Sequence, residues 1–197
     1  MRPTAFPDEL TLREARERFF RESGLGPDGD YSARWVKVEL KPLPVYFPNT
    51  PRRVRAVKLH DLHHVVTGYD TTLAGEAEIG AWELASGCAH HYPAWILNYG
   101  SFCLGLFLAP RRLFDAFVRG RHSSNLYRGE FQEEFLDHTV GEMRRTLLPE
   151  RTPSPGAADV ACFTAWTVSV AVAMGVGAGL GAAMLRRATH TRRSSSG

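Results

Sequence analysis

Cysteine is scarce in this chain, which limits the kinds of site it can build. The 197 residues include only Cys88, Cys103 and Cys162, and no two of them form a Cys-x-x-Cys pair. That number and spacing exclude a disulfide framework and a cysteine-rich zinc site. We therefore interpret the three as small buried hydrophobic residues.

The beginning of the chain lacks the apolar run of a secretory leader. Met1 to Thr4 lead within a few residues to the acidic pair Asp8 and Glu9. This pattern predicts no signal peptide. Together with the few cysteines, it places the expected body of the protein in the reducing cytoplasm.

The body of the chain has no excess of either charge. The formal net charge is +3, but residues 186–197 hold four arginines and no acid, so the other 185 residues carry 20 basic and 21 acidic side chains. A nucleic-acid-binding surface would need a basic stripe on the folded domain, so we expect no nucleic acid partner. A hydrophobic content of 44% with 11% aromatic residues also excludes a disordered chain.

The stronger candidate for a membrane span is the uncharged 26-residue segment Val160–Leu185. As a helix it would be about 39 Å long, against about 30 Å of hydrocarbon in a bilayer. A proline-containing linker over residues 149–159 precedes it and the basic tail of residues 186–197 follows. We predict a C-terminal membrane anchor over residues 160–185; a packed terminal core helix is the alternative.

A second uncharged segment, Tyr92–Pro110, is 19 residues long and is interrupted by Asn98 and several small residues. It predicts a buried central helix or one wall of a lipid groove rather than a span. Trp95, Phe102 and Phe107 are the candidate lipid-binding residues. Arginines follow this segment, as an amphipathic lipid with an anionic head would require. An ordinary core helix followed by a solvated basic one remains the alternative.

The remaining pattern is mainly helical. The predicted fold is a mainly α helical bundle, with a short β-hairpin in the N-terminal region of residues 1–50 and a C-terminal hydrophobic, transmembrane helix. Apolar periodicity and capping residues predict the elements within it. Helices are expected over residues 12–23, 51–66, from about 72 to 87, 111–119 and 130–148, and extended segments over residues 35–40 and 43–47.

The residues that carry chemistry lie on the helix that begins at Pro51. Relative to His60, the side chain of His64 is rotated by about 40° and that of Asp61 by about 100°, so the three share one arc. A tight turn then brings the next helix back, and Glu76 near its start can face them. Two imidazoles and two carboxylates are sound ligands for a divalent cation. We expect zinc, with iron, manganese or magnesium as alternatives. The alternative to a metal site is that these residues form an ordinary polar surface of the helix.

Two neighbouring residues extend this group. His63 points away from Asp61, which suits a supporting hydrogen-bond donor or a surface residue. Glu83 follows Glu76 by seven residues and shares its helix face. It is the candidate catalytic base or an acceptor that supports the ligands; a surface salt-bridge partner is the alternative.

Three known patterns can be compared with this stretch. His60-Asp61 could be the dyad of an HD-type phosphohydrolase, but no histidine precedes His60. His60-x-x-His63-His64 also matches one histidine box of the membrane di-iron desaturases, which need several such boxes. The whole pattern, His60-Asp61-x-x-His64 followed after eleven residues by Glu76, resembles the signature of the ubiquinone (coenzyme Q) biosynthesis protein four family.

Further residues carry this resemblance over residues 52–148. They include the turn Val66-Thr67-Gly68, the pair Gly75-Glu76, and the later elements Arg119-Gly120 and Asn125-Leu126-Tyr127. Residues 51–148 would then form the helical metal-binding domain, with His60, Asp61, His64 and Glu76 as its metal ligands. The N-terminal region and the apolar C-terminal segment differ from the usual family pattern, which indicates a divergent, bacterial-type member.

The resemblance implies a metal-dependent, membrane-associated protein of ubiquinone or prenyl-quinone biosynthesis. It would act at ring carbon one of a polyprenylated hydroxybenzoate, by decarboxylation coupled to hydroxylation. The expected partners are that polyprenylated aromatic lipid, the membrane and other quinone-biosynthesis proteins. The alternative is a non-catalytic scaffold of the biosynthetic complex that binds prenyl lipid and holds a structural metal.

Overall fold

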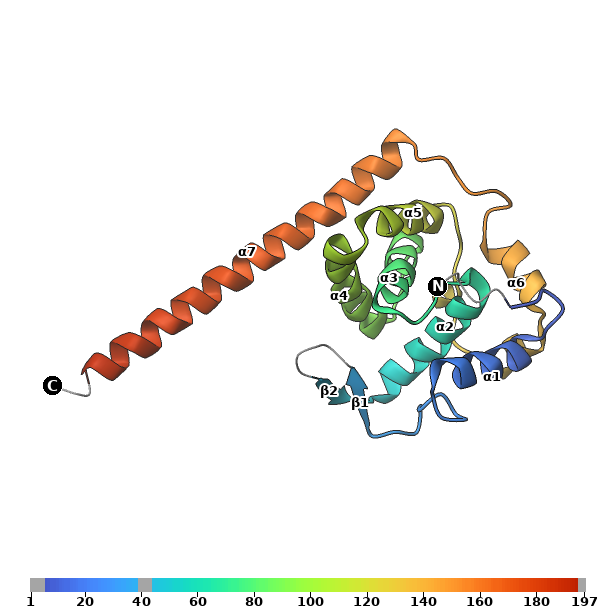
Figure 1. The fold of residues 1–197 in the computed structure, drawn as a ribbon, viewed down its shortest axis with the longest axis horizontal. Coiled ribbons are helices and arrows are strands. Elements are labelled where there is room, and N and C mark those ends of the chain that lie inside the picture. Colours follow the sequence, from blue (N-terminus) through green and yellow to red (C-terminus); the bar gives the residue numbers. More distant parts are fainter. Residues whose placement is uncertain (1–5, 39–43, 195–197) are drawn as a thin grey trace. The chain divides into compact units, whose positions relative to one another are not determined.

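The computed structural model describes residues 6–38 and 44–194, and the side chains of the last helix as far as Val176. The chain divides into two compact units, residues 1–154 and residues 155–197, which are described separately. The first unit carries six α-helices, one β-hairpin and two short 3-10 helices within the described residues, so the predicted mainly α fold with an N-terminal hairpin is confirmed (Figure 1).

Helix α1 (Leu12–Ser23) has the bounds that the sequence predicted. The Thr11 hydroxyl accepts a hydrogen bond from the backbone of Glu14, whose carboxylate bonds back to Thr11, a capping box that fixes the first turn. Gly24 ends the helix with a φ of 71°, in the left-handed region that favours glycine.

Strands β1 (Trp35–Val38) and β2 (Val45–Pro48) pair antiparallel, with Trp35 opposite Pro48. This confirms the predicted hairpin. Leu40 and Leu43, which belonged to the predicted extended segments, lie outside the described residues.

Helices α2 (Pro51–Thr67) and α3 (Leu73–Ser86) agree with the predicted bounds within one or two residues. Thr50 caps α2 ahead of Pro51, and Thr72 caps α3, because each hydroxyl accepts a hydrogen bond from a first-turn N–H. Seven consecutive residues at the end of α2, from Asp61 to Thr67, are buried. Helix α2 is therefore the central helix of this unit.

The predicted uncharged helix is α4 (Tyr92–Leu108), and α5 (Pro110–Arg121) follows directly. Both pack against α3 (Figure 1). The approach of α5 to α3 depends on Gly120, because a Cβ there would collide with the backbone oxygen of Trp82. The expectation of a buried α4 is met on one side only: Phe102 is fully buried, whereas Phe107 is 71% exposed.

The predicted single helix over residues 130–148 is wrong. The chain instead forms the 3-10 helices η1 (Leu126–Arg128) and η2 (Glu133–Asp137), and then α6 (Val140–Leu147). His138 and Thr139 are extended, and Thr139 forms a β-bridge with Thr11. Thr139 then caps α6 in a capping box with Glu142, so a new helix starts where the prediction had a continuous one.

The hydrophobic core of the first unit joins α1, α2 and α6 around residues such as Leu12, Leu59 and Leu62, all fully buried. Two arginines complete the end of α2. The guanidinium of Arg119 donates to the carbonyl of Thr67, and that of Arg144 donates to the carbonyl of Val66. The last carbonyls of a helix lack partners within it, so these bonds fix the end that carries the histidines.

The second unit is helix α7 (Ala157–Ser194). Its segment Ala157–Val176 is long and apolar enough to cross a membrane, and within the described residues it is the one helix that is so. This segment begins three residues before the predicted anchor and is mostly unburied.

Candidate metal centre

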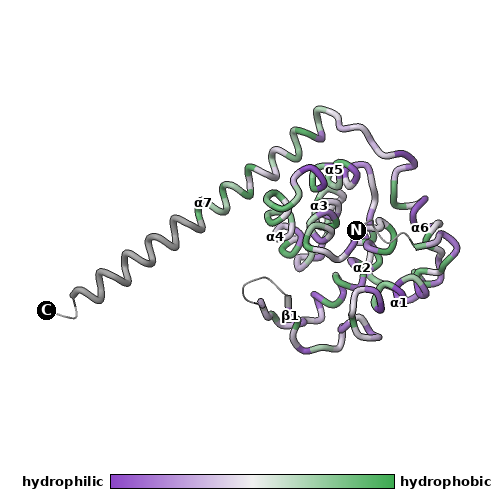
Figure 2. Tube along the Cα trace, viewed as in Figure 1, coloured by the Kyte–Doolittle hydropathy of each residue, from purple (hydrophilic) through white to green (hydrophobic). Residues whose placement is uncertain are grey.

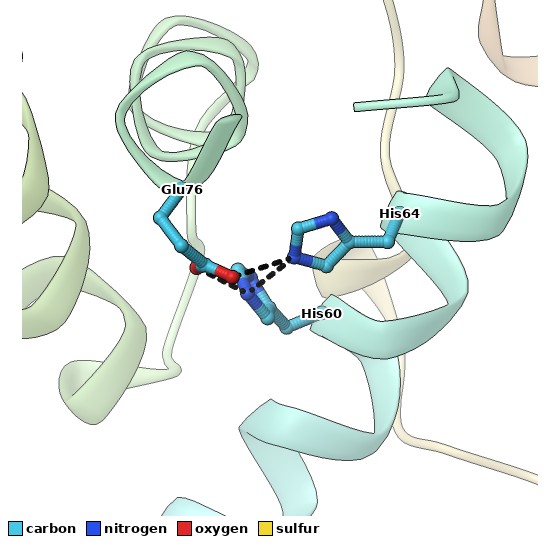
Figure 3. A group of neighbouring side chains, drawn as sticks. All are labelled: His60, His64 and Glu76. Carbon is cyan, nitrogen blue, oxygen red and sulfur yellow. Dashed lines mark hydrogen bonds and ion pairs between the residues drawn. The ribbon is translucent and has the colours of Figure 1, made fainter. Parts of the chain in front are cut away.

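Three side chains from α2 and α3 converge at one point (Figure 3). The Nε2 atoms of His60 and His64 lie 3.2 Å apart. The Oε2 atom of Glu76 lies 3.5 Å from Nε2 of His60, and its Oε1 atom lies 3.4 Å from Nε2 of His64. The sequence predicted this meeting, because His60 and His64 are one helical turn apart and Glu76 lies just past the turn between the helices.

These separations fit a bound cation. An ion held tetrahedrally by nitrogen and oxygen at about 2.0–2.1 Å places its ligand atoms about 3.3–3.4 Å from one another. His60, His64 and Glu76 already have that spacing. These three residues could therefore hold a metal ion without rearrangement of the helices.

Hydrogen bonds from the Nδ1 atoms of His60 and His64 fix the orientation of both imidazole rings. His64 donates from Nδ1 to the carbonyl of Tyr69 at 2.9 Å, and His60 donates from Nδ1 to the carboxylate of Glu83 at 2.9 Å. A neutral imidazole that donates from Nδ1 keeps a free lone pair on Nε2. When both rings are neutral, as metal ligands must be, both lone pairs face the position between His60, His64 and Glu76, as in metal sites whose histidines are oriented by carboxylates or carbonyls.

Glu83 is fully buried and is held by four donors. Besides His60, it accepts hydrogen bonds from the ring of His63 at 2.6 Å, the amide of Asn98 and the hydroxyl of Tyr127 at 3.0 Å. A surface salt-bridge role is thereby excluded. Because Glu83 lies on the Nδ1 side of His60, it supports the ligands from behind and does not face the open side of the site.

His63 connects this network to a distant loop. Its Nε2 accepts a hydrogen bond from the backbone N–H of Leu126 at 2.9 Å, while Nδ1 donates to Glu83. The ring also contacts those of Trp82 and Tyr127. His63 is thus the supporting donor that the sequence allowed, and it is fully buried.

Asp61 is not among the three converging side chains. It is buried on α2, and its carboxylate accepts a hydrogen bond of 2.6 Å from the hydroxyl of Tyr31, in the loop after α1. Its place as a fourth metal ligand remains a prediction. No pattern in the sequence indicated Tyr31, because its bond to Asp61 joins segments thirty residues apart.

The electrostatics favour a cation at this position. Burial lowers the pKa of His60, but the charges and hydrogen bonds of Glu83 and Glu76 outweigh it, so its pKa is raised well above the ordinary value. Burial raises the pKa of Glu76, yet the nearby imidazoles of His64 and His60 reverse this effect and hold its pKa below the ordinary value. Burial likewise raises the pKa of Glu83, but His60 and His63 reverse this effect and hold it below the ordinary value, so both carboxylates are ionised at neutral pH.

The site is open on one side. The side chain of His64 is 1% exposed and that of His60 20%, whereas the carboxylate-bearing side chain of Glu76 is 38% exposed. Gly75 helps to set this position, because a Cβ there would collide with the carbonyl of Asp70 in the turn before α3. A ligand from solvent can approach from the side of Glu76.

A second group of histidine and glutamate side chains lies at the surface. His90, His91 and Glu130 also bring three ligand atoms close together. Here His90 and Glu130 are both more than half exposed and already form an ion pair at 2.8 Å. An exposed pair of this kind needs no metal, so variants of this group are a matched control for variants of the first.

The three candidate lipid-binding side chains do not share one face of α4. Phe102 is fully buried, Trp95 is partly buried and donates from its ring N–H to the carbonyl of Ala89, and Phe107 is exposed. The helical rotation of about 140° between Phe102 and Phe107 accounts for this separation. Lipid binding by these residues remains a prediction.

No family model, curated protein or solved structure matches this chain.

Proposed function

We propose that this protein is a metal-dependent, membrane-associated protein of ubiquinone or prenyl-quinone biosynthesis, acting at ring carbon one of a polyprenylated hydroxybenzoate. The observation that carries the metal-dependent part is the convergence of two imidazole lone pairs and one carboxylate at 3.2–3.5 Å. The quinone pathway rests on the motif His60-Asp61-x-x-His64 followed, after eleven intervening residues, by Glu76.

His60, His64 and Glu76 would hold the ion, with Asp61 as the further ligand that the motif suggests. Zinc is the expected metal, and iron, manganese and magnesium also suit imidazole and carboxylate ligands. When bound, a divalent cation supplies Lewis-acid polarisation of the aryl carboxylate. The chain itself keeps both rings oriented through Glu83 and Tyr69 and leaves the Glu76 side free for the substrate.

The reaction proposed at ring carbon one is a decarboxylation. The bond between ring carbon one and the carboxyl carbon breaks, carbon dioxide leaves, and a proton from solvent at the open side takes its place on the ring. When hydroxylation is coupled to it, the ring carbon takes up a hydroxyl group instead of that proton; dioxygen is the oxidant, water is consumed, and hydrogen peroxide is released together with the carbon dioxide. Glu83 has four hydrogen-bond donors and no exposure, so its role is to position His60 rather than to exchange protons with the substrate.

The direct test is turnover by the purified full-length chain. A polyprenylated hydroxybenzoate bearing labelled carbon in its carboxyl group is supplied in detergent micelles, and the labelled carbon dioxide is collected. Release is expected with the metal-loaded protein and is expected to fall at least a hundredfold in Glu76→Gln. The variant His90→Ala/Glu130→Ala, altered only at the exposed group, is expected to keep wild-type release.

The alternative is a non-catalytic scaffold that binds prenyl lipid and holds a structural metal. The ligands come from two different helices, so a bound ion would also link α2 to α3. A scaffold would retain its metal and co-purify with quinone-biosynthesis proteins, yet release no labelled carbon dioxide above the level of Glu76→Gln. The two functions are therefore separated by the same assay.

A further inference from the structure

Helix α4 exposes a strip of large apolar side chains. Tyr92, Ile96 and Phe107 are 69, 72 and 71% exposed, and Leu97 and Leu108 are 40 and 51% exposed. Figure 2 shows hydrophobic residues along α4. A soluble surface seldom gathers so many on one element without a binding role.

The exposed residues lie on one side of the helix. At 100° per residue, they all fall within an arc of about 160°, and no charged residue shares that arc. The other side of α4 is occupied: Ala94, Asn98 and Phe102 are buried, and the helix packs against α3. The exposed arc, called here the α4 strip, is thus an apolar surface about 25 Å long on a firmly packed helix.

Two observations identify the partner as a lipid surface. First, Arg111 is exposed just beyond the end of the α4 strip, and no acid of the described residues forms an ion pair with it. Its positive charge therefore lies next to the apolar surface. An apolar helix face with tyrosine and arginine at its ends is typical of helices that lie in the interface of a membrane.

Second, the same chain carries the candidate membrane span in α7. Only nine residues, Leu148–Gly156, join the end of α6 to the start of α7. Fully extended, they reach about 30 Å. A spanning α7 would therefore keep the first unit close to a bilayer and raise the local concentration of lipid around the α4 strip.

We propose that the α4 strip lies in the interfacial region of the bilayer that α7 anchors to, with Arg111 contacting anionic headgroups. The proposal rests on the membrane assignment of α7 and not on the metal or on the identity of the substrate. A failure of the metal site or of the decarboxylation assay would leave it unaffected.

The test uses the full-length chain, one copy per nanodisc of mixed phosphatidylcholine and phosphatidylglycerol. A polarity-sensitive fluorophore is attached through Phe107→Cys after Cys103 and Cys162 are replaced by serine. The matched label is attached through Glu17→Cys, an exposed residue of α1. We expect a blue-shifted emission and at least a twofold quenching by nitroxide-labelled lipid at position 107, and neither at position 17.

A second pair of variants tests whether the α4 strip is specific. With the label moved to Tyr92→Cys, Ile96→Ser/Phe107→Ser is expected to lose most of the lipid quenching. Trp35→Ser/Tyr46→Ser removes two similarly exposed aromatic residues of the hairpin and is expected to keep it. Circular dichroism of each variant checks that it is folded.

Four outcomes would overturn the proposal. Equal quenching at positions 107 and 17 would indicate unspecific adsorption, as would an equal loss in the hairpin variant. A label at position 107 that stays fully exposed to water would show that neither lipid nor protein covers the α4 strip. A label that is shielded from water but not quenched by lipid would show that protein, such as a second copy of this chain, covers the strip instead.

Discussion

The Nε2 atoms of His60 and His64 face each other across 3.2 Å, with the two rings at 89°. Each ring donates from Nδ1 to an acceptor behind it, so the two Nε2 lone pairs point into the same space. Two lone pairs at this distance are stable together only with a cation or a proton between them. The carboxylate of Glu76 lies within 3.5 Å of both Nε2 atoms and supplies a negative charge that also attracts a cation to this position.

The first prediction concerns metal content. The purified chain is expected to carry about one divalent ion, and His64→Ala/Glu76→Ala is expected to reduce this to near zero, because each substitution removes a ligand. Elemental analysis by mass spectrometry after gel filtration gives the ratio and the identity of the ion. His90→Ala/Glu130→Ala should retain the wild-type value; equal loss in both double variants would contradict the assignment of the site.

Glu83→Gln tests whether the buried carboxylate positions the ligands. The exchange keeps the shape of the side chain but removes the charge that orients His60 and His63. Loss of such a supporting group typically lowers metal affinity about 10–100-fold. Competition with a chromogenic chelator measures this affinity, and an unchanged value would show that the imidazoles hold their orientation without Glu83.

Tyr127→Phe removes one of the four donors to Glu83 and leaves both histidine bonds in place. A hydrogen bond to a buried charged group contributes about 2 kcal/mol, so the free energy of unfolding should fall by that amount. Metal affinity should change far less than in Glu83→Gln. Urea unfolding gives the free energy of unfolding, and chelator competition gives the metal affinity. A larger loss of affinity than in Glu83→Gln would contradict the view that Glu83 orients the ligands and Tyr127 mainly stabilises Glu83.

The capping box of α6 predicts a dependence of stability on pH. The backbone N–H and the hydroxyl of Thr139 hold the pKa of Glu142 below its ordinary value. A lowered pKa means that the ionised group stabilises the fold above the ordinary carboxyl pKa, and that this contribution is lost as the pH falls through the lowered value. Thr139→Ala should therefore raise the Glu142 pKa in an NMR titration.

The same substitution should reduce stability by about 1 kcal/mol near neutral pH, as is usual for the loss of an N-cap. Thr146→Ala makes the same chemical change inside α6 and is the control, for which we expect little or no loss. If both variants were equally stable, Thr139 would not be the residue that starts the helix.

Deletion of residues 157–197 tests the membrane assignment of α7. The truncated chain should move from the membrane fraction toward the soluble fraction, because the only candidate span of the described residues is removed. Deletion of the basic tail alone, residues 186–197, should leave the distribution unchanged. A truncated chain that stays wholly in the membrane fraction would make the α4 strip the main attachment and α7 dispensable.

Local signals in the sequence were sufficient for most helix ends. Thr50 with Pro51, Thr72 and the glycine at 24 mark boundaries that depend on one or two side chains, and the structure has them there. The helix predicted over residues 130–148 was wrong because the apolar spacing continues on both sides of a helix boundary of the same kind. Thr139 followed three residues later by Glu142 marks that boundary.

The converging ligands were predictable, and their supporting network was not. His60 and His64 share a face through helical periodicity, and a short turn brings Glu76 to them. Asn98 and Tyr127 reach Glu83 only through the packing of distant helices, which no periodicity in the sequence encodes. The exposure of the α4 strip was missed for the same reason, since composition does not tell which side of an apolar helix finds a neighbour.

The four donors to Glu83 also bear on the order in which the chain folds. They come from α2, α4 and η1, so the carboxylate cannot be satisfied until residues 60 to 127 are all present and assembled. Pairing of α2 with α3 alone would bury a charge with half of its partners missing, which costs several kcal/mol. The nascent helices should thus remain loosely associated until Tyr127 docks, and closure of the core and completion of the site should occur in one cooperative step.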